Sequence, residues 1–123
     1  MILVDTSVWI DHLRQGNEHL AQLLGQGQVL AHPHVIGELA LGNLQNRSAV
    51  LGALQELPQV AVATDDEVLQ FIATNTVFGL GIGYTDAHLV AAVRLTPGTK
   101  LWTRDKRLLA VSAELGLAYL ATH

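Results

Sequence analysis

The feature that most limits how this chain can fold is the alternation of short apolar runs with longer segments of helical periodicity. The apolar runs lack the polar residue at every second position that a half-exposed strand shows, so we interpret them as strands buried on both faces. Strands of this kind, separated by helices, are typical of a parallel sheet with helices on both sides. The predicted strands are residues 2–4, 29–31, 60–63, 101–103 and 117–120.

Apolar residues that recur every three or four positions predict helices between these strands. Pro33 suits the first turn of one helix, and Pro58 ends another. Thr64 or Asp65 is a candidate N-cap, as is Thr85. The predicted helices are residues 7–14, 18–24, 33–44, 47–57, 65–78, 86–95 and 105–115.

The length of 123 residues, without a visible linker or repeat, predicts a single domain over residues 1–123 with an α/β fold class. The absence of cysteine excludes a disulfide framework and any thiolate metal site, and it fits a reducing compartment. No cationic segment precedes the first apolar run, and no run of about 18 apolar residues occurs, so we expect neither a signal peptide nor a membrane span. We therefore expect a cytoplasmic protein.

Four acidic residues fall where the predicted strands and helices meet. Asp5 directly follows the first strand, and Asp105 lies two residues beyond the fourth. Glu38 lies about one and a half turns into the helix after the second strand, and Asp86 begins a helix behind a glycine-rich loop. Because sites in such sheets form beyond the carboxyl ends of the strands, we expect the four side chains to converge. Each also has an ordinary interpretation, since Asp commonly caps helices and Glu in a helix is commonly solvated.

Converging carboxylates repel one another, at a cost of roughly 4 kcal/mol for two charges about 4 Å apart at an effective dielectric near 20. Such a cluster therefore needs a cation. Oxygen ligands without cysteine favour Mg²⁺ or Mn²⁺ over zinc, and no pair among the six histidines has a strong third ligand at zinc-like spacing. A divalent ion of this kind lowers the pKa of a bound water and holds a phosphate oxygen, which is the chemistry of phosphodiester hydrolysis.

The formal net charge of −4 argues against a broad electrostatic surface for nucleic acid. Three of the seven cations nevertheless lie close together, namely Arg104, Lys106 and Arg107. They are candidates for attracting phosphate to the site, and the alternative is the solvated start of a helix.

Two other acidic phosphotransfer folds do not fit. A haloacid-dehalogenase-like phosphatase needs a second Asp two positions after the first, where this chain has Ser7. A receiver domain needs a pair of acids near the first strand, but Asp65 and Asp66 follow the third predicted strand. A non-catalytic module that binds RNA or protein remains an alternative, although the presence of all four acids counts against it.

Four segments resemble, in order, the motifs of the PIN-domain family, in particular its VapC-like toxins of type II toxin–antitoxin pairs. They are MILVDTSVWIDHLR at the start, HPHVIGELALG at 32–42, GIGYTDAHLVAAV at 81–93 and LWTRDKRL at 101–108. The resemblance implies a three-layer α/β/α sandwich with a central parallel sheet and a Mg²⁺- or Mn²⁺-dependent endoribonuclease. It places the catalytic and metal-binding acids at Asp5, Glu38, Asp86 and Asp105, with Thr6 and Thr103 as hydroxyl residues beside them.

The same resemblance implies an RNA substrate, a small VapB-like antitoxin that covers the active site, and a homodimer. Five apolar residues of the first two predicted helices have core packing as their default interpretation, and the alternative is a partly exposed groove that takes an amphipathic antitoxin helix. These residues are Trp9, Leu13, Leu20, Leu23 and Leu24.

Overall fold

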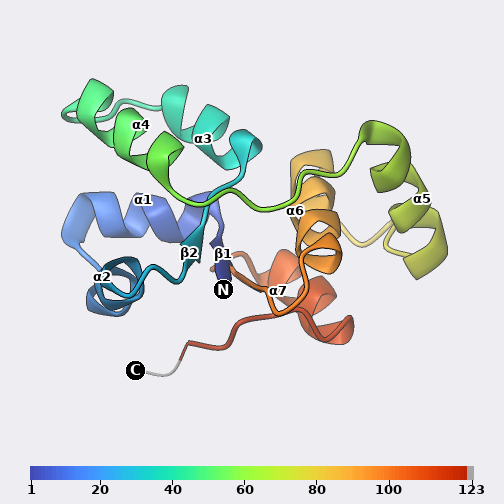
Figure 1. Cartoon of the computed structure of the whole chain (residues 1–123). Helices are drawn as coiled ribbons and strands as arrows, with labels where there is room; N and C mark the ends of the chain where they lie inside the picture. Colours follow the sequence, from blue (N-terminus) through green and yellow to red (C-terminus); the bar gives the residue numbers. More distant parts are fainter. Residues whose placement is uncertain (122–123) are drawn as a thin grey trace.

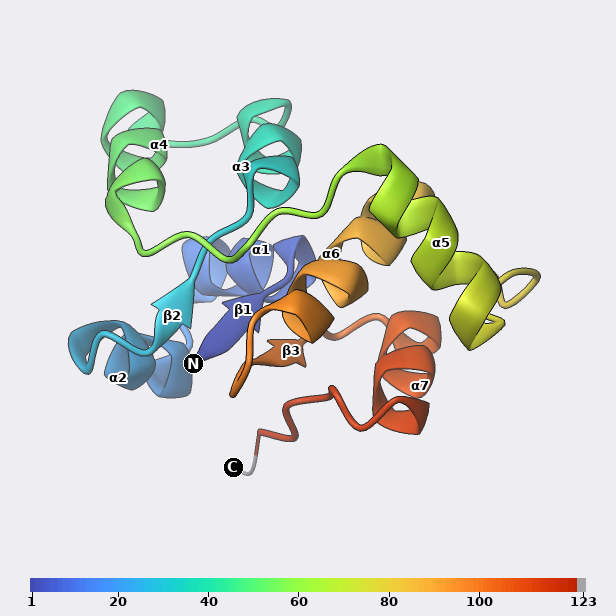
Figure 2. The same cartoon turned by 45° about the vertical axis from the view of Figure 1, so that its right-hand side comes forward.

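Three parallel strands form the centre of the computed structural model, which describes residues 1–121; residues 122 and 123 of the predicted domain lie outside the described residues. The strands are β1 (Ile2–Val4), β2 (Val29–Leu30) and β3 (Lys100–Trp102), in the order β2-β1-β3. β1 is the central strand, and its Ile2 lies opposite Val29 on one side and Lys100 on the other. Helices flank the sheet, which lies in the middle of the molecule (Figures 1 and 2).

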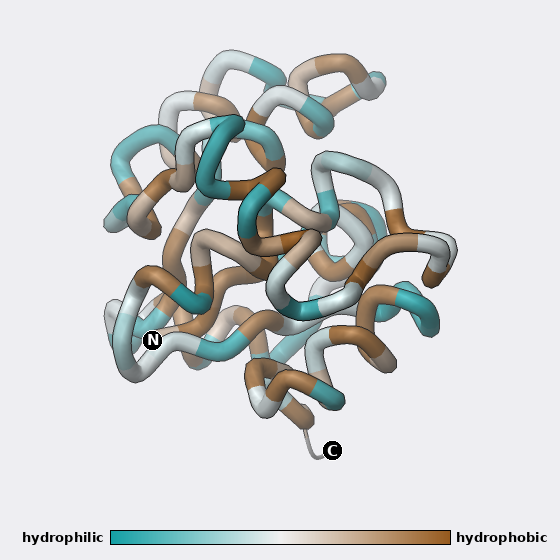
Figure 3. Tube along the Cα trace, turned by 90° about the vertical axis from the view of Figure 1, so that its right-hand side faces the viewer, coloured by the Kyte–Doolittle hydropathy of each residue, from teal (hydrophilic) through white to brown (hydrophobic). Residues whose placement is uncertain are grey.

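The helices all lie within or close to the predicted segments. They are α1 (Thr6–Gln15), α2 (Glu18–Gly25), α3 (Pro33–Ala40), α4 (Arg47–Glu56), α5 (Asp65–Asn75), α6 (Tyr84–Leu95) and α7 (Lys106–Glu114). Thr64 caps α5 as predicted, because its Oγ1 accepts the Glu67 N–H and Glu67 Oε1 accepts the Thr64 N–H. Along the outer helices, hydrophobic and hydrophilic stretches alternate (Figure 3).

Two predicted strands, 60–63 and 117–120, are wrong as strands. Residues 60–63 form no bridge, although Gln59 just before them makes one isolated parallel bridge to Ala31, and the second segment makes one, from Ala118 to Leu101. The neighbouring strands β2 and β3 have only two and three residues, so they offer few backbone groups with which a further strand could pair. The apolar composition of these runs instead reflects burial against the core, as for Val60 and Ala63.

Three helix ends also differ from the prediction. α3 stops at Ala40 rather than near residue 44, and α5 stops at Asn75, where the next residue, Thr76, takes a left-handed φ of 55° that ends the helix. α6 begins at Tyr84 with Gly83 as its N-cap, two residues earlier than the predicted Thr85 cap.

Helix α6 is the most deeply buried helix that the structure describes, with an unbroken buried segment from Ala87 to Val93. It packs on both α5 and β3. The core beneath it contains fully buried leucines from the strands and from α7, such as Leu3, Leu101 and Leu108. Among residues 1–121, no helix is both long and apolar enough to cross a membrane.

Replacing Leu3 by Ala is expected to lower the free energy of unfolding by about 2–5 kcal/mol, because it leaves a cavity beside the central strand. Urea unfolding of the purified protein measures this loss. Leu69→Ala is the matched control, since Leu69 lies on α5 with 58% of its surface exposed and should change stability by less than about 0.5 kcal/mol. Equal stability of both variants would contradict the central position of β1.

Candidate acidic site

Asp5 ends the central strand and is the N-cap residue of α1, with only 5% of its surface exposed. Its Oδ2 accepts two hydrogen bonds, from the Ser7 hydroxyl at 2.8 Å and from the Thr103 hydroxyl at 2.7 Å. No described residue donates a hydrogen bond to Oδ1. The two hydroxyls therefore fix the orientation of the carboxylate and leave one oxygen for another partner.

The same two hydroxyls also hold the chain just after β3. The Arg104 N–H donates to Ser7 Oγ, and the Asp105 N–H donates to Thr103 Oγ1, both at 3.0 Å. Ser7 was not among the site residues predicted from sequence. The signal that could have found it is its spacing, because Ser or Thr two positions after an Asp is well placed for a local side-chain hydrogen bond.

Asp105 is the N-cap residue of α7, and its Oδ1 accepts the Leu108 N–H at 2.9 Å. Asp86 lies in the first turn of α6, and its Oδ2 accepts the Gly83 N–H at 3.0 Å. Both residues thus have the capping role that was the ordinary alternative for each. This role uses one oxygen of each carboxylate and leaves the second oxygen for another partner.

Glu38 reaches the site from α3, which packs against α1. The Thr6 hydroxyl, in the first turn of α1, donates to Glu38 Oε1 at 2.7 Å. The two predicted hydroxyl residues therefore hold different carboxylates, Thr6 that of Glu38 and Thr103 that of Asp5.

The pKa of Asp86 is raised above its usual value, first by burial and then by the negative charges of Asp5, Asp105 and Glu38. The four acids are thus close enough to interact electrostatically, as expected from their places at the ends of strands and helices. Within residues 1–121, however, no three His, Asp or Glu side chains are already arranged as the ligands of a metal ion.

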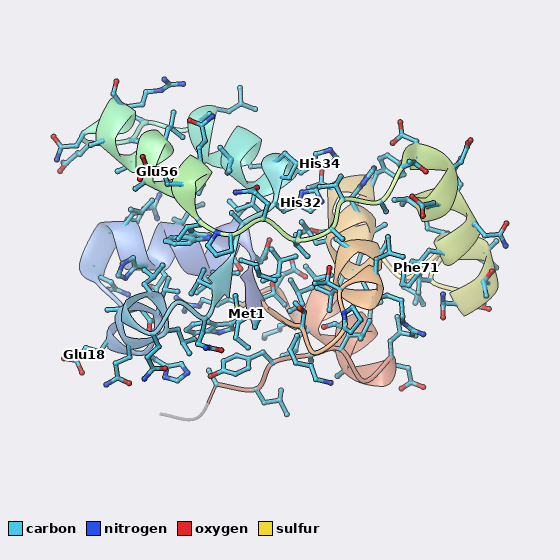
Figure 4. The ribbon with its side chains drawn as sticks, in the orientation of Figure 1. Met1, Glu18, His32, His34, Glu56 and Phe71 are labelled. Atoms are coloured by element: carbon cyan, nitrogen blue, oxygen red, sulfur yellow. The ribbon has the colours of Figure 1, made fainter. Side chains whose placement is uncertain are left out.

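A cluster of histidines joins the two helices that carry Glu38 and Asp86. His32 and His34 begin α3, and Figure 4 shows their side chains on the side of α3 that faces α6. The ring centroid of His34 lies 5.0 Å from that of His32 and 4.4 Å from that of His88 on α6. This contact lies between α3 and α6, and it contributes to the relative position of the two acids.

The hydrogen bonds of this cluster define its tautomers. His32 Nδ1 accepts the His34 N–H, so the proton of neutral His32 lies on Nε2. Burial lowers the pKa of His32 to about 4, which keeps it neutral at pH 7. His88 Nε2 donates to Asp65 Oδ1 at 3.1 Å. A protonated Nε2 on His32 argues against a metal ligand at that atom.

The three predicted basic residues have different surroundings. Arg104 pairs with Asp11, Nη1 to Oδ1 at 2.7 Å, and both line a cavity of about 370 Å³ with Ser7 and Arg14. Arg107 lies across Gly81 in the loop before α6, where an added Cβ would lie 2.8 Å from Arg107 Nη1. Lys106 begins α7 and is exposed.

A second cavity, of about 360 Å³, lies between α1 and the end of α3. Its lining residues are Ile10, Leu13, Arg14, Glu38, Leu39, Gly42, Asn43, Leu44 and Gln45. We call it the α1–α3 groove.

Of the five apolar residues singled out on the first two helices, four belong to the core, as the default interpretation held. Trp9 and Leu20 are buried, and Leu23 and Leu24 are partly buried against the core. Leu13 alone of the five lines the groove. The helices present their apolar faces to the core, and the groove forms where α1 meets α3 instead.

Comparison with known proteins identifies relatives over nearly the whole chain. Residues 2–114 match the family described as PIN domain. The chain is 51% identical over 118 residues to Ribonuclease VapC32 of Mycobacterium tuberculosis, covering 96% of this chain and 95% of that protein, in both strain H37Rv and strain CDC 1551.

Two solved structures share the fold. FitAcB from Neisseria gonorrhoeae matches with a TM-score of 0.64 at 21% identity, over 92% of this chain and 94% of that one. FitAB bound to an IR36 DNA fragment matches with a TM-score of 0.61 at 20% identity, over 100% of this chain and 99% of that one. These likenesses confirm the predicted α/β fold class.

Replacing Asp86 by Asn is expected to raise the free energy of unfolding of the metal-free protein at pH 7. Because the pKa of Asp86 is raised in the folded chain, ionisation of this residue favours the unfolded state. The gain should be absent below the unfolded value of 3.8, develop as the pH rises above it and be complete above the raised pKa. Asn keeps an oxygen that accepts the Gly83 N–H. Urea unfolding in EDTA across this pH range measures the difference.

Asp65→Asn is the control of opposite sign. Hydrogen bonds from Tyr84 and then His88 lower the pKa of Asp65, so its ionised form stabilises the folded chain above the unfolded pKa, and this contribution is lost as the pH falls through the lowered value. Asp65→Asn should therefore lower stability at pH 7. Asp86→Asn protein that is less stable than the parent at pH 7 would contradict the repulsion among the four acids.

Proposed function

This chain belongs to the PIN-domain family, and we propose that it is a Mg²⁺- or Mn²⁺-dependent endoribonuclease, the toxin of a VapBC-type toxin–antitoxin pair. The observation that carries this proposal is the electrostatic interaction of Asp86 with Asp5, Glu38 and Asp105, four acids contributed by separate segments. The 51% identity to a protein named as a ribonuclease supports RNA as the substrate.

The chemistry of the four acids fits a divalent cation. Their donors are oxygens, their charges repel, and Asp5, Asp86 and Asp105 each keep one oxygen outside the hydrogen bonds described above. We assign Asp5 and Asp86 as direct ligands, with Asp105 and Glu38 completing the set directly or through water. The bound ion would offset the negative charge, hold a phosphate oxygen and lower the pKa of a water molecule.

The surrounding hydroxyls position these carboxylates. Ser7 and Thr103 bind the same oxygen of Asp5, which keeps Oδ1 available, and Thr6 restrains Glu38. In hydrolysis, the oxygen of water forms a bond to phosphorus, the bond from phosphorus to the leaving sugar oxygen breaks, and the water proton passes to a base. We propose that one of the four carboxylates orients this water.

Because the net charge of the chain is −4, the phosphates of RNA must be attracted by a small group of basic residues near the site rather than by the surface as a whole. We propose that Arg107 makes the closest phosphate contact, since its side chain lies on the loop that leads into Asp86. Arg104 and Lys106 form the outer part of this basic region, and the charge of Arg104 is partly offset by Asp11.

The α1–α3 groove is the proposed site of a small VapB-like antitoxin. Its apolar side chains Ile10, Leu13, Leu39 and Leu44 suit the apolar face of an amphipathic segment, and Glu38 lines the same groove. A partner bound here would cover Glu38 and so obstruct the site. We also propose a homodimer, following the family resemblance.

Asp5→Asn is expected to lower Mg²⁺- or Mn²⁺-dependent cleavage of structured RNA by at least about 100-fold. Replacing a residue that only hydrogen-bonds a metal ligand already lowers metal affinity or activity by about 10- to 100-fold, and Asp5 is assigned as a ligand itself. Gel analysis of RNA with each ion and with EDTA measures cleavage. Asp66→Asn removes the same charge from an exposed position on α5 and should cleave normally. A fully active Asp5→Asn protein would refute the assignment, and a folded parent that cleaves no RNA would favour the non-catalytic binding module.

Leu13→Lys is expected to weaken antitoxin binding by at least about tenfold, because it places a charge in the apolar part of the groove. Co-expression with a small VapB-like antitoxin, followed by co-purification and titration, measures this effect. Leu69→Lys, on α5 and outside the groove, is the matched control. Undiminished binding by Leu13→Lys would place the antitoxin elsewhere.

A further inference from the structure

One exposed carboxylate outside the acidic site is hydrogen-bonded to the helix that carries Asp86. Asp65 is the first residue of α5, and 80% of its side-chain surface is exposed. Its Oδ1 accepts two hydrogen bonds from α6, one from the Tyr84 hydroxyl at 2.9 Å and one from His88 Nε2 at 3.1 Å. These bonds, first that of Tyr84 and then that of His88, lower the pKa of Asp65, so they favour its ionised form. Two donors of one helix therefore meet on a single charged oxygen.

The start of α5 is a firm anchor for these bonds. Thr64, directly before Asp65, exchanges hydrogen bonds with Glu67 across the first turn of the helix. Val68, on the next turn, is fully buried in the core. α5 packs against α6, and the two helices lie side by side in Figures 1 and 2. Because these contacts fix its own position, Asp65 can hold α6 in place.

The two donors lie on one face of α6, and Asp86 lies on another. Tyr84 and His88 are four positions apart, so their side chains lie one above the other along the helix. Asp86 is two positions from each of them, which places it about 200° around the helix axis. Bonds to the first face therefore restrict rotation of α6 about its axis, and this rotation sets where the Asp86 carboxylate points.

His88 also connects α6 to the helix that carries Glu38. Only 3% of the surface of His88 is exposed, and its ring centroid lies 4.4 Å from that of His34 on α3. His34 and Glu38 are four positions apart, so they lie on the same side of α3. Figure 4 shows the His34 side chain on the side that faces α6. The contacts from Asp65 through His88 to His34 thus join α5, α6 and α3, and they link the helices that carry two of the four acids.

We propose that Asp65 is a positioning residue, which acts through His88 and Tyr84 to hold Asp86 at the spacing from Glu38 that a divalent ion requires. The proposal rests on the proposed function, because it concerns the same acidic site. A metal site needs its ligands placed to within about 0.5 Å, and residues that do not touch the ion commonly supply this precision. Asp65 itself does not bind the ion in this assignment.

The test measures Mn²⁺ binding without RNA. Mn²⁺ is titrated into the metal-free protein at pH 7, electron paramagnetic resonance follows the free ion, and urea unfolding in EDTA gives the stability of each variant. Asp65→Ala removes the acceptor, and His88→Phe removes the donor but keeps a ring against His34. His88→Gln keeps an N–H donor near the place of Nε2 but loses the ring. Asp66→Ala, at the next exposed position of α5, is the matched control.

Asp65→Ala should weaken Mn²⁺ binding by at least about fivefold, with unchanged stoichiometry. His88→Phe should weaken it by at least about threefold, since the bond from Tyr84 remains. The double variant should bind no more than about twofold more weakly than Asp65→Ala, because both changes break the same connection. His88→Gln and Asp66→Ala should stay within about 1.5-fold of the parent.

Two results would overturn the positioning role. One is parental Mn²⁺ affinity in Asp65→Ala, whether or not its free energy of unfolding falls, because a merely structural residue changes stability alone. The other is an equal loss of affinity in His88→Phe and His88→Gln, which would assign the effect to the shape of the ring rather than to its bond with Asp65. Failure of the proposed function looks different. The parent then binds no Mn²⁺, or Asp5→Asn binds it equally well, and the positioning role fails with it.

Discussion

The buried carboxylate of Asp5 is the constraint on which the rest of this structure depends. A charge at the end of a central strand is costly unless it is hydrogen-bonded, and here Ser7 and Thr103 supply both bonds. The same hydroxyls accept the N–H groups of Arg104 and Asp105. One network therefore joins the end of β1, the first turn of α1 and the start of α7. The edge of the sheet and the acidic site are held by the same bonds.

The other two acids depend on helix packing rather than on strand ends. Glu38 lies on α3 and Asp86 on α6, and the rings of His34 and His88 pack between these helices. The buried segment of α6 leaves this helix little freedom to move against the sheet. The pKa of Asp86 is raised first by the burial of its carboxyl group in this packing and then by the negative charges of Asp5, Asp105 and Glu38.

Much of this organisation was predictable from local patterns. Apolar runs marked the three strands, and helical periodicity located every helix to within a few residues. The predictions of strands at residues 60–63 and 117–120 were wrong because the same apolar composition also suits an extended segment that faces the core. A strand differs from such a segment only in the number of backbone hydrogen-bond partners that a neighbouring strand offers. Strand ends also indicated where the acids would meet. Ser7 was not predicted as a site residue; its spacing after Asp5 is a local signal, but its bond to the Arg104 N–H joins segments far apart in the chain.

The sequence by itself determined the fold class, the family resemblance and the identity of the four acids, because residue order and hydrophobic period are local properties. Only the tertiary structure decided which hydroxyl holds which carboxylate, and that Arg104 pairs with Asp11 while Arg107 crosses Gly81. These features depend on packing between segments distant in the chain. Arg104 and Arg107 are close in sequence and have the same chemistry. Their surroundings differ because Arg104 precedes α7 and Arg107 lies in its first turn.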